Sequence, residues 1–175
     1  MSKFLLFDGY NLAFRAFYAM PDLTRSDGFP TNAIHGWVRT LWYLFDQESP
    51  DRLAAFFDLG GAEKRTELHA DYKANRLETP EELEKQVPWL KRITAAMGCA
   101  VIERRGIEAD DLIGAWARHL SGEGHTVRII SADKDLAQCL VHPGVTQLLP
   151  PPTANPKLGW RELDSEGVSA KFGVE

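Results

Sequence analysis

The chain has 175 residues, a formal net charge of −5, 44% hydrophobic residues and two cysteines. This length supports one domain with a full hydrophobic core and excludes two ordinary domains. The negative charge argues against a nucleic-acid partner, unless bound metal ions neutralise part of the acidic surface.

The sequence shows neither the pattern of a membrane span nor that of a signal peptide. No apolar run approaches the roughly eighteen residues of a membrane span, and the N-terminus reaches Asp8 too early for a signal peptide. Cys99 and Cys139 lie in apolar surroundings and form no C-x-x-C pair, which is typical of buried thiols in a reducing compartment. We therefore expect a cytoplasmic protein without a membrane partner.

The first third of the chain alternates apolar strands with helices. Residues 3–8 form an apolar run, and a helical pattern follows Gly9. Residues 19–30 lack periodicity and predict a loop, after which an amphipathic helix of about four turns is expected. Residues 52–58 repeat the first pattern, because a second apolar strand ends on an aspartate.

The middle of the chain is more polar. Residues 62–77 are predicted to form a helix without a clear apolar stripe, as expected of a helix that stands away from the core. Residues 79–82 match a capping box with Pro80 at the first helical position, and Gly98 is expected to end the helix that follows.

The remaining elements continue the alternation. Further strands are predicted at residues 100–103, 126–131 and 145–149. A helix begins near Asp110, and a short helix is expected beyond the prolines at 150–152. This order predicts an α/β fold with a mostly parallel central sheet and helices on both faces.

Carboxylates follow the predicted strands at their carboxyl ends. They are Asp8, Asp58, Glu108, Asp110, Asp111, Asp133 and Asp135. Ligands of such sheets bind beyond this edge, so we expect the seven side chains to converge. Capping of a helix N-terminus is the alternative explanation for the acids at 108–111. Three acids within four residues exceed what capping requires.

Such convergence indicates a metal site. Two carboxylates 5 Å apart repel by roughly 3 kcal/mol at an effective dielectric near 20. Oxygen ligands suit Mg²⁺ or Mn²⁺, and two such ions can hydrolyse a phosphodiester without a protein nucleophile. Phosphatases and phosphotransferases use similar acids, so the acids alone leave the substrate open.

The polar middle segment points to nucleic acid. Four cations, Lys64, Arg65, Lys73 and Arg76, outnumber Glu67 and Asp71 there, and Tyr72 adjoins Lys73. Cations can hold phosphates while an aromatic ring stacks on a base, as in single-strand binding. A solvated helix with ordinary i,i+4 ion pairs is the alternative.

With these residues identified, the sequence resembles the 5′ nuclease family, in particular the N-terminal domain of bacterial DNA polymerase I 5′-3′ exonucleases and their stand-alone relatives. The matching segments are residues 7–17, 57–58, 65 with 72–76, 106–113 and 131–136. The resemblance implies a PIN-like 5′-3′ exonuclease domain over residues 1–150. It also implies a helical arch at about residues 62–86, through which a single-stranded 5′ end passes.

The resemblance also implies roles for single residues. The acids that would surround one metal are Asp8, Asp58, Glu108, Asp110 and Asp111. Asp133 and Asp135 would help to hold a second ion, and Lys73 joins the catalytic residues. The expected contacts to phosphates and bases are Arg65, Tyr72, Lys73 and Arg76, with Arg15 a weaker candidate.

The C-terminal segment departs from the family pattern. In the family, a segment like residues 169–175 leads into a further acidic motif and a helix-hairpin-helix module that grips duplex DNA. Residues 151–175 are therefore expected to be an extension toward that module. We expect a weakly bound second ion and a partner chain or domain that supplies the module.

The sequence thus predicts a magnesium-dependent 5′-3′ exonuclease or flap endonuclease, with Mn²⁺ able to substitute, acting on DNA with free 5′ ends or flaps. A PIN-type endoribonuclease is one alternative, although the long, partly cationic span between the second strand and Glu108 argues against it. A catalytically weak DNA-binding remnant is the other alternative.

Overall fold

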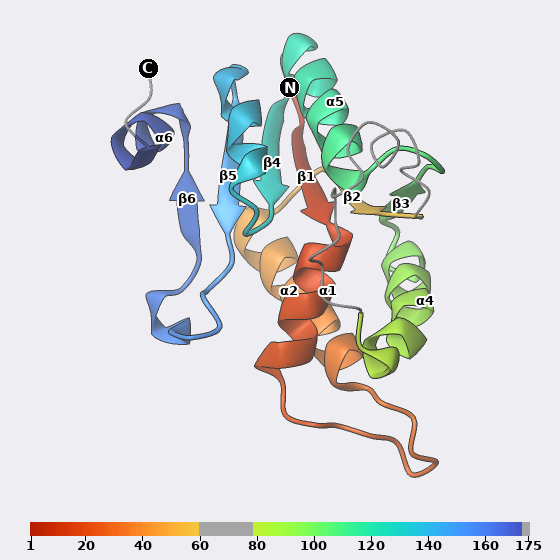
Figure 1. Ribbon diagram of the computed structural model, residues 1–175. Helices are drawn as coiled ribbons and strands as arrows, with labels where there is room; N and C mark the ends of the chain where they lie inside the picture. The colour runs from red at the N-terminus through yellow and green to blue at the C-terminus, as the bar shows by residue number, and fades with distance from the viewer. Residues whose placement is uncertain (60–78, 173–175) are drawn as a thin grey trace, which may run out of the picture.

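The computed structural model describes residues 1–59 and 79–172, which form an α/β domain with a central sheet (Figure 1). The sheet order is β3-β2-β1-β4-β5-β6. The strands are β1 (Lys3–Asp8), β2 (Arg52–Phe57), β3 (Ala100–Glu103), β4 (Thr126–Ile130), β5 (Val145–Leu149) and β6 (Arg161–Leu163). All pairs are parallel except β5 with β6, which confirms the predicted, mostly parallel sheet.

Helices cover both faces of this sheet. They are α1 (Gly9–Ala19), α2 (Asn32–Glu48), α4 (Glu81–Ala96), α5 (Ala109–Gly122), α6 (Ser165–Phe172) and the 3₁₀ helices η1 (Asp135–Val141) and η2 (Pro156–Leu158). Side chains alternate along β1, so Leu5 and Phe7 join the core under α1, α2 and α4. Leu6 joins the opposite core, under α5 and η1.

Trp37 anchors the first of these cores. Its ring centroid lies 6.5 Å from that of Phe7 and 5.8 Å from that of Phe57. The indole N–H donates to Thr94 Oγ1 at 2.9 Å, so the buried ring leaves no polar atom unpaired. One side chain of α2 thereby fixes α4 against the central strands.

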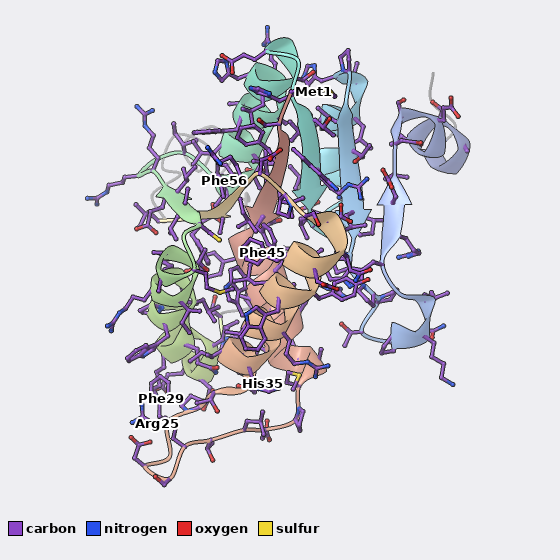
Figure 2. The ribbon with its side chains drawn as sticks, turned by 180° about the vertical axis from the view of Figure 1, so that it is seen from behind. Met1, Arg25, Phe29, His35, Phe45 and Phe56 are labelled. Carbon is purple, nitrogen blue, oxygen red and sulfur yellow. The ribbon has the colours of Figure 1, made fainter. Side chains whose placement is uncertain are left out.

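Residues 20–31 form the predicted loop (Figure 2). An isolated antiparallel bridge joins Thr24 to Pro30 within it. Phe29 packs edge-on against Trp89 of α4, with ring centroids 6.5 Å apart. The loop is therefore attached to α4 near its C-terminal end, at Phe29.

Two sequence predictions need correction. The capping box at Thr79 is wrong, because α4 begins after Pro80 and no side chain caps it. The carbonyl of Pro80 instead accepts the amides of Leu83 and Glu84. Strand β6 was missed, since three residues are too few for an alternating pattern and their pairing with β5 depends on tertiary contact.

The segment predicted as an arch lies mostly outside the described residues, which resume at residue 79. Residues 81–86 form the first turns of α4, where Leu83 and Gln86 are fully buried. Among the described helices, none has the length and apolar character of a membrane span.

Helices α1 and α2 cross closely at Gly36. A Cβ added there would lie 2.9 Å from the Cβ of Ala16. We expect Gly36→Ala to lower the free energy of unfolding by about 1–3 kcal/mol in a denaturant titration. Gly114→Ala, in the interior of α5, is the control, because its Cβ would meet only Cys139 Sγ at 3.6 Å. The control should hold or raise stability by up to about 1 kcal/mol. Equal stability of Gly36→Ala and wild type would contradict this close crossing.

Candidate metal centre

The carboxyl ends of the central strands bring distant acids to one edge of the sheet. Asp8 is the last residue of β1 and pairs with Phe56, two residues before Asp58. Phe7 pairs with Ile130, the last residue of β4, which places the following turn at the same level. Parallel pairing therefore aligns the positions that carry Asp8, Asp58 and the segment of Asp133.

Asp8 is held by two hydrogen bonds and crowded by two acids. Its Oδ1 accepts the amide of Asn11 at 3.2 Å, which caps α1, and its Oδ2 accepts the hydroxyl of Ser131 at 2.8 Å. Burial raises the pKa of Asp8 to about 6. The two hydrogen bonds oppose this rise, and the negative charges of Asp133 and Asp58 add to it. Asp58 and Asp133 thus each act electrostatically on Asp8.

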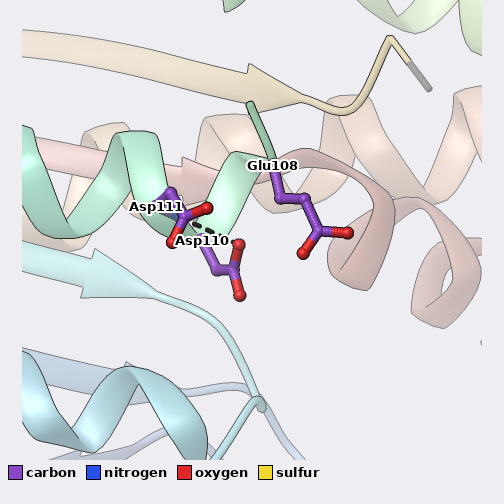
Figure 3. A group of neighbouring side chains, drawn as sticks. All are labelled: Glu108, Asp110 and Asp111. Carbon is purple, nitrogen blue, oxygen red and sulfur yellow. Dashed lines mark hydrogen bonds between the residues drawn. The ribbon is translucent and has the colours of Figure 1, made fainter. Parts of the chain in front are cut away.

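The start of α5 supplies the largest group of acids (Figure 3). Carboxylate oxygens of Glu108, Asp110 and Asp111 all lie within 4.8 Å of one another. Glu108 is buried, Asp110 is half-buried and Asp111 is exposed. Asp58, just after β2, accepts the amide of Ala109 with its Oδ1 at 2.7 Å. The end of β2 and the N-terminus of α5 are thereby tied together.

The turn after β4 positions Asp133. Its amide donates to Ser131 Oγ at 3.0 Å, and the amide of Ala132 donates to Asn11 Oδ1 at 3.0 Å. Asp133 Oδ1 accepts the amide of Asp135 at 2.9 Å. Asp135 itself is exposed at the start of η1, and within the described ranges its carboxylate takes part in no hydrogen bond or salt bridge.

Capping accounts for only part of this arrangement. Asp8 and Asp58 each accept an amide at the start of a helix, and Asp110 accepts the amide of Asp111 at 2.8 Å. Helix capping requires no approach of separate acids to one another, however. In the part of the chain that the structure describes, no salt bridge reaches Asp8, Asp58, Asp133 or Asp135. Carboxylates such as those of Asp8 and Asp58, with which no cation of the described residues pairs, fit a hard divalent ion such as Mg²⁺ or Mn²⁺.

Most of the predicted substrate contacts belong to the segment between β2 and α4. Arg65, Tyr72, Lys73 and Arg76 lie outside the described residues. Arg15 lies about two turns along α1 from Asp8 and does not join the acids.

Arg15 instead lines a groove of about 460 Å³ between α1, α2 and residues 150–160. Burial lowers the pKa of Arg15, and the positive charge of Arg161 adds to this shift. Arg39 also lines the groove, as do Tyr43 and Trp160, whose rings stack with centroids 5.6 Å apart. The groove therefore combines cations with aromatic surface.

Three polar residues of the site were not assigned a role from the sequence. Asn11 and Ser131 lie within the motifs at residues 7–17 and 131–136, and their hydrogen bonds join the turn after β4 to α1 and Asp8. Gln147 is the third, and its amide donates to the carbonyl oxygens of Ser131 and Asp133. A polar residue in the apolar strand at 145–149 was the available signal.

The fold and its acidic edge define a PIN-like α/β domain. The chain belongs to the family described as "5'-3' exonuclease, N-terminal resolvase-like domain", which it matches over residues 3–173.

The chain is similar to parts of longer proteins. It is 41% identical over 172 residues to DNA polymerase I of Caldicellulosiruptor bescii, covering 98% of this chain and 20% of the polymerase. It is 39% identical over 175 residues to a 5′-3′ exonuclease of Aquifex aeolicus, covering 100% of this chain and 58% of that protein. The chain thus spans between a fifth and about three fifths of these relatives.

A solved structure has the same fold. The flap endonuclease of bacteriophage T5, in a pseudo-enzyme-product complex with DNA and metal ions, superposes with a TM-score of 0.69 at 21% identity. The match covers 98% of this chain and 61% of the phage chain.

The raised pKa of Asp8 predicts a pH-dependent stability without metal. The folded state binds this proton more tightly than the unfolded state, so stability is lost as pH rises from about 4 to about 6. In chelator at pH 7, Asp8→Asn should raise the free energy of unfolding by up to about 3 kcal/mol, because it removes a buried negative charge near two other acids while Asn can still cap α1. The gain should vanish near pH 3.5. A gain that is equal at both pH values would contradict the crowding of Asp8.

Proposed function

We propose that this chain is the catalytic part of a 5′-3′ exonuclease or flap endonuclease that hydrolyses DNA phosphodiester bonds with the help of Mg²⁺. This proposal depends above all on the placement of the acids at one edge of the sheet. Asp58 acts electrostatically on Asp8, and its Oδ1 accepts the amide of Ala109, beside the group around Glu108. The described residues form no salt bridge with Asp8 or Asp58. Family membership supports nuclease chemistry for these acids.

Two sets of ligands follow from this proposal. The first ion would be held by Asp8, Asp58, Glu108, Asp110 and Asp111, and the second by Asp133 and Asp135. Such ions supply an activated water, neutralise the attacked phosphate and stabilise the leaving oxygen, and Mn²⁺ would substitute for Mg²⁺. The second ion would bind more weakly, because it has fewer carboxylate ligands.

The chain itself orients these ligands. The hydroxyl of Ser131 donates to Asp8, and the amide of Ala109 donates to Asp58, so both carboxylates are held before an ion arrives. A proton competes for Asp8 below its pKa of about 6. Metal binding should therefore weaken as pH falls through this value.

DNA with a free 5′ end or flap is the proposed substrate. By resemblance to the family, Arg65, Tyr72, Lys73 and Arg76 would contact its phosphates and bases. The groove beside Arg15 would hold a further part of the DNA, since guanidinium groups bind phosphates and exposed aromatic rings can stack on bases.

Partners and compartment are part of the proposal. The relatives are longer than this chain, and we propose that a further domain or chain supplies a helix-hairpin-helix module that grips duplex DNA. Cys99 and Cys139 are free, buried thiols, which suits the cytoplasm as the proposed compartment.

A cleavage assay distinguishes the proposed activity from its alternatives. Labelled 5′-flap DNA and single-stranded RNA are compared with and without Mg²⁺. The proposal requires metal-dependent cleavage of the DNA. Preferential cleavage of RNA would identify a PIN-type endoribonuclease, and binding of DNA without cleavage would identify a non-catalytic remnant.

Removal of a proposed metal ligand should abolish cleavage without unfolding the chain. Asp110→Ala and Asp133→Ala should each lower the Mg²⁺-dependent rate by at least about 100-fold, because charge stabilisation of the phosphate is lost. Asp46→Ala, at an exposed position of α2, is the matched control and should keep the wild-type rate. Circular dichroism reports the fold. Wild-type rates in both site variants would refute the ligand assignment.

Arg15 should contribute to DNA binding rather than to the chemical step. Arg15→Ala should weaken binding several-fold and reduce the slope of log K against log salt by about one, because one phosphate contact is lost. Arg118→Ala, at an exposed position of α5, provides the control. The measurement is fluorescence anisotropy at several salt concentrations. An unchanged slope in Arg15→Ala would exclude Arg15 as a phosphate contact.

A further inference from the structure

Gln147 is a buried polar residue behind the turn that carries Asp133. It lies in the middle of β5 and its side chain is 0% exposed. Its Nε2 donates to the carbonyl oxygen of Ser131 at 3.0 Å and to that of Asp133 at 2.7 Å. One amide group therefore holds two carbonyls of the same turn.

The orientation of this amide follows from its surroundings. An NH₂ group has two hydrogens, and here both are used. The reversed amide would place Oε1 against two carbonyl oxygens, which repel it. Among the described residues, Oε1 has no hydrogen-bond partner.

Core packing alone does not explain a glutamine at this position. A buried acceptor without a partner is unfavourable, and the neighbours Val145 and Leu148 show that the sheet accommodates aliphatic side chains here. The two bonds of Nε2 are the specific contribution of Gln147 to the structure.

These bonds complete a network around Asp133. The carbonyls of the turn are held by Gln147, while its amides are held by Asn11 and by the hydroxyl of Ser131. The same hydroxyl donates to Asp8. Because both the amides and the carbonyls of this turn are hydrogen-bonded, Asp133 has little freedom to move relative to Asp8.

We propose that Gln147 is a positioning residue for Asp133, and that it sets the affinity of the second divalent cation without touching that ion. This inference rests on the proposed function, because Asp133 is a proposed ligand of that ion. Partners that orient a metal ligand commonly contribute a factor of roughly 10 to 100 to affinity.

Gln147→Met tests the inference, because methionine retains the length of the side chain and removes its donor. Gln86→Met is the matched control. Gln86 is also 0% exposed, and its Nε2 donates to Asn32 Oδ1 and to the carbonyl of Glu82, both at 2.9 Å. It lies on α4 and contacts none of the proposed ligands, so it controls for the loss of a buried amide.

Binding of Mn²⁺ to the whole chain is measured by electron paramagnetic resonance and calorimetry, without DNA. In Gln147→Met, the weaker site should lose roughly 10- to 100-fold in affinity, while the tighter site stays within about twofold. Cleavage should need correspondingly more metal and recover at saturation, with an unchanged KM for DNA. Gln86→Met should lower the melting temperature and leave both metal affinities unchanged.

Equal metal affinities in Gln147→Met and wild type, or equal losses in both variants, would overturn the positioning role. If Gln147→Met does not fold, nuclear magnetic resonance of the wild-type chain decides. The side-chain NH₂ signals of Gln147 should shift with the midpoint of the weaker site in a Mg²⁺ titration. Signals that follow the tighter site, or do not move, would reject the inference.

The two proposals fail differently. A wild-type chain that binds no divalent cation overturns the proposed function and this inference together. Unchanged affinity in Gln147→Met overturns the role of Gln147 alone.

Discussion

The burial of a carboxylate close to other acids, at the carboxyl edge of the sheet, is the constraint on which the rest of this domain depends. Asp8 resists ionisation because it is buried near Asp58 and Asp133. The fold holds several of these acids in place with hydrogen-bond donors, such as the amide of Ala109 for Asp58 and the hydroxyl of Ser131 for Asp8. These donors come from different elements, so the whole edge depends on their packing.

Glu48, at the end of α2, shows how the same fold treats an acid that has protein cations. Burial raises the pKa of Glu48, but Lys3 and Arg128, whose nitrogens lie 2.6 and 2.8 Å away, outweigh it and lower the pKa overall. Asp8 has no such cation among the described residues, and its pKa rises. The pKa values of these two partly buried acids therefore shift in opposite directions. A cation bound at the carboxyl edge would stabilise the fold there, as Lys3 and Arg128 do beside Glu48.

Buried side-chain amides align the helices and turns of the domain. Gln86 binds Asn32 at the start of α2, and Asn32 donates to the carbonyl of Phe17 near the end of α1. Gln147 likewise holds the turn after β4, by donating to the carbonyls of Ser131 and Asp133. Hydrogen bonds need particular directions, whereas apolar contacts tolerate sliding, so such amides fix how the elements sit relative to one another.

The sequence by itself determined the parallel strands, because short apolar runs followed by Asp8 and Asp58 alternate with helical patterns, the order typical of a parallel sheet. It also determined the residue types at the acidic edge, since the topology of a parallel sheet brings strand ends together. Only the tertiary structure decided that β6 pairs with β5, that Pro80 rather than Thr79 is the residue before the first turn of α4, and that Gln147 holds the turn of Asp133. Each of these depends on a partner distant in sequence or on the exact path of the backbone, which local patterns do not encode.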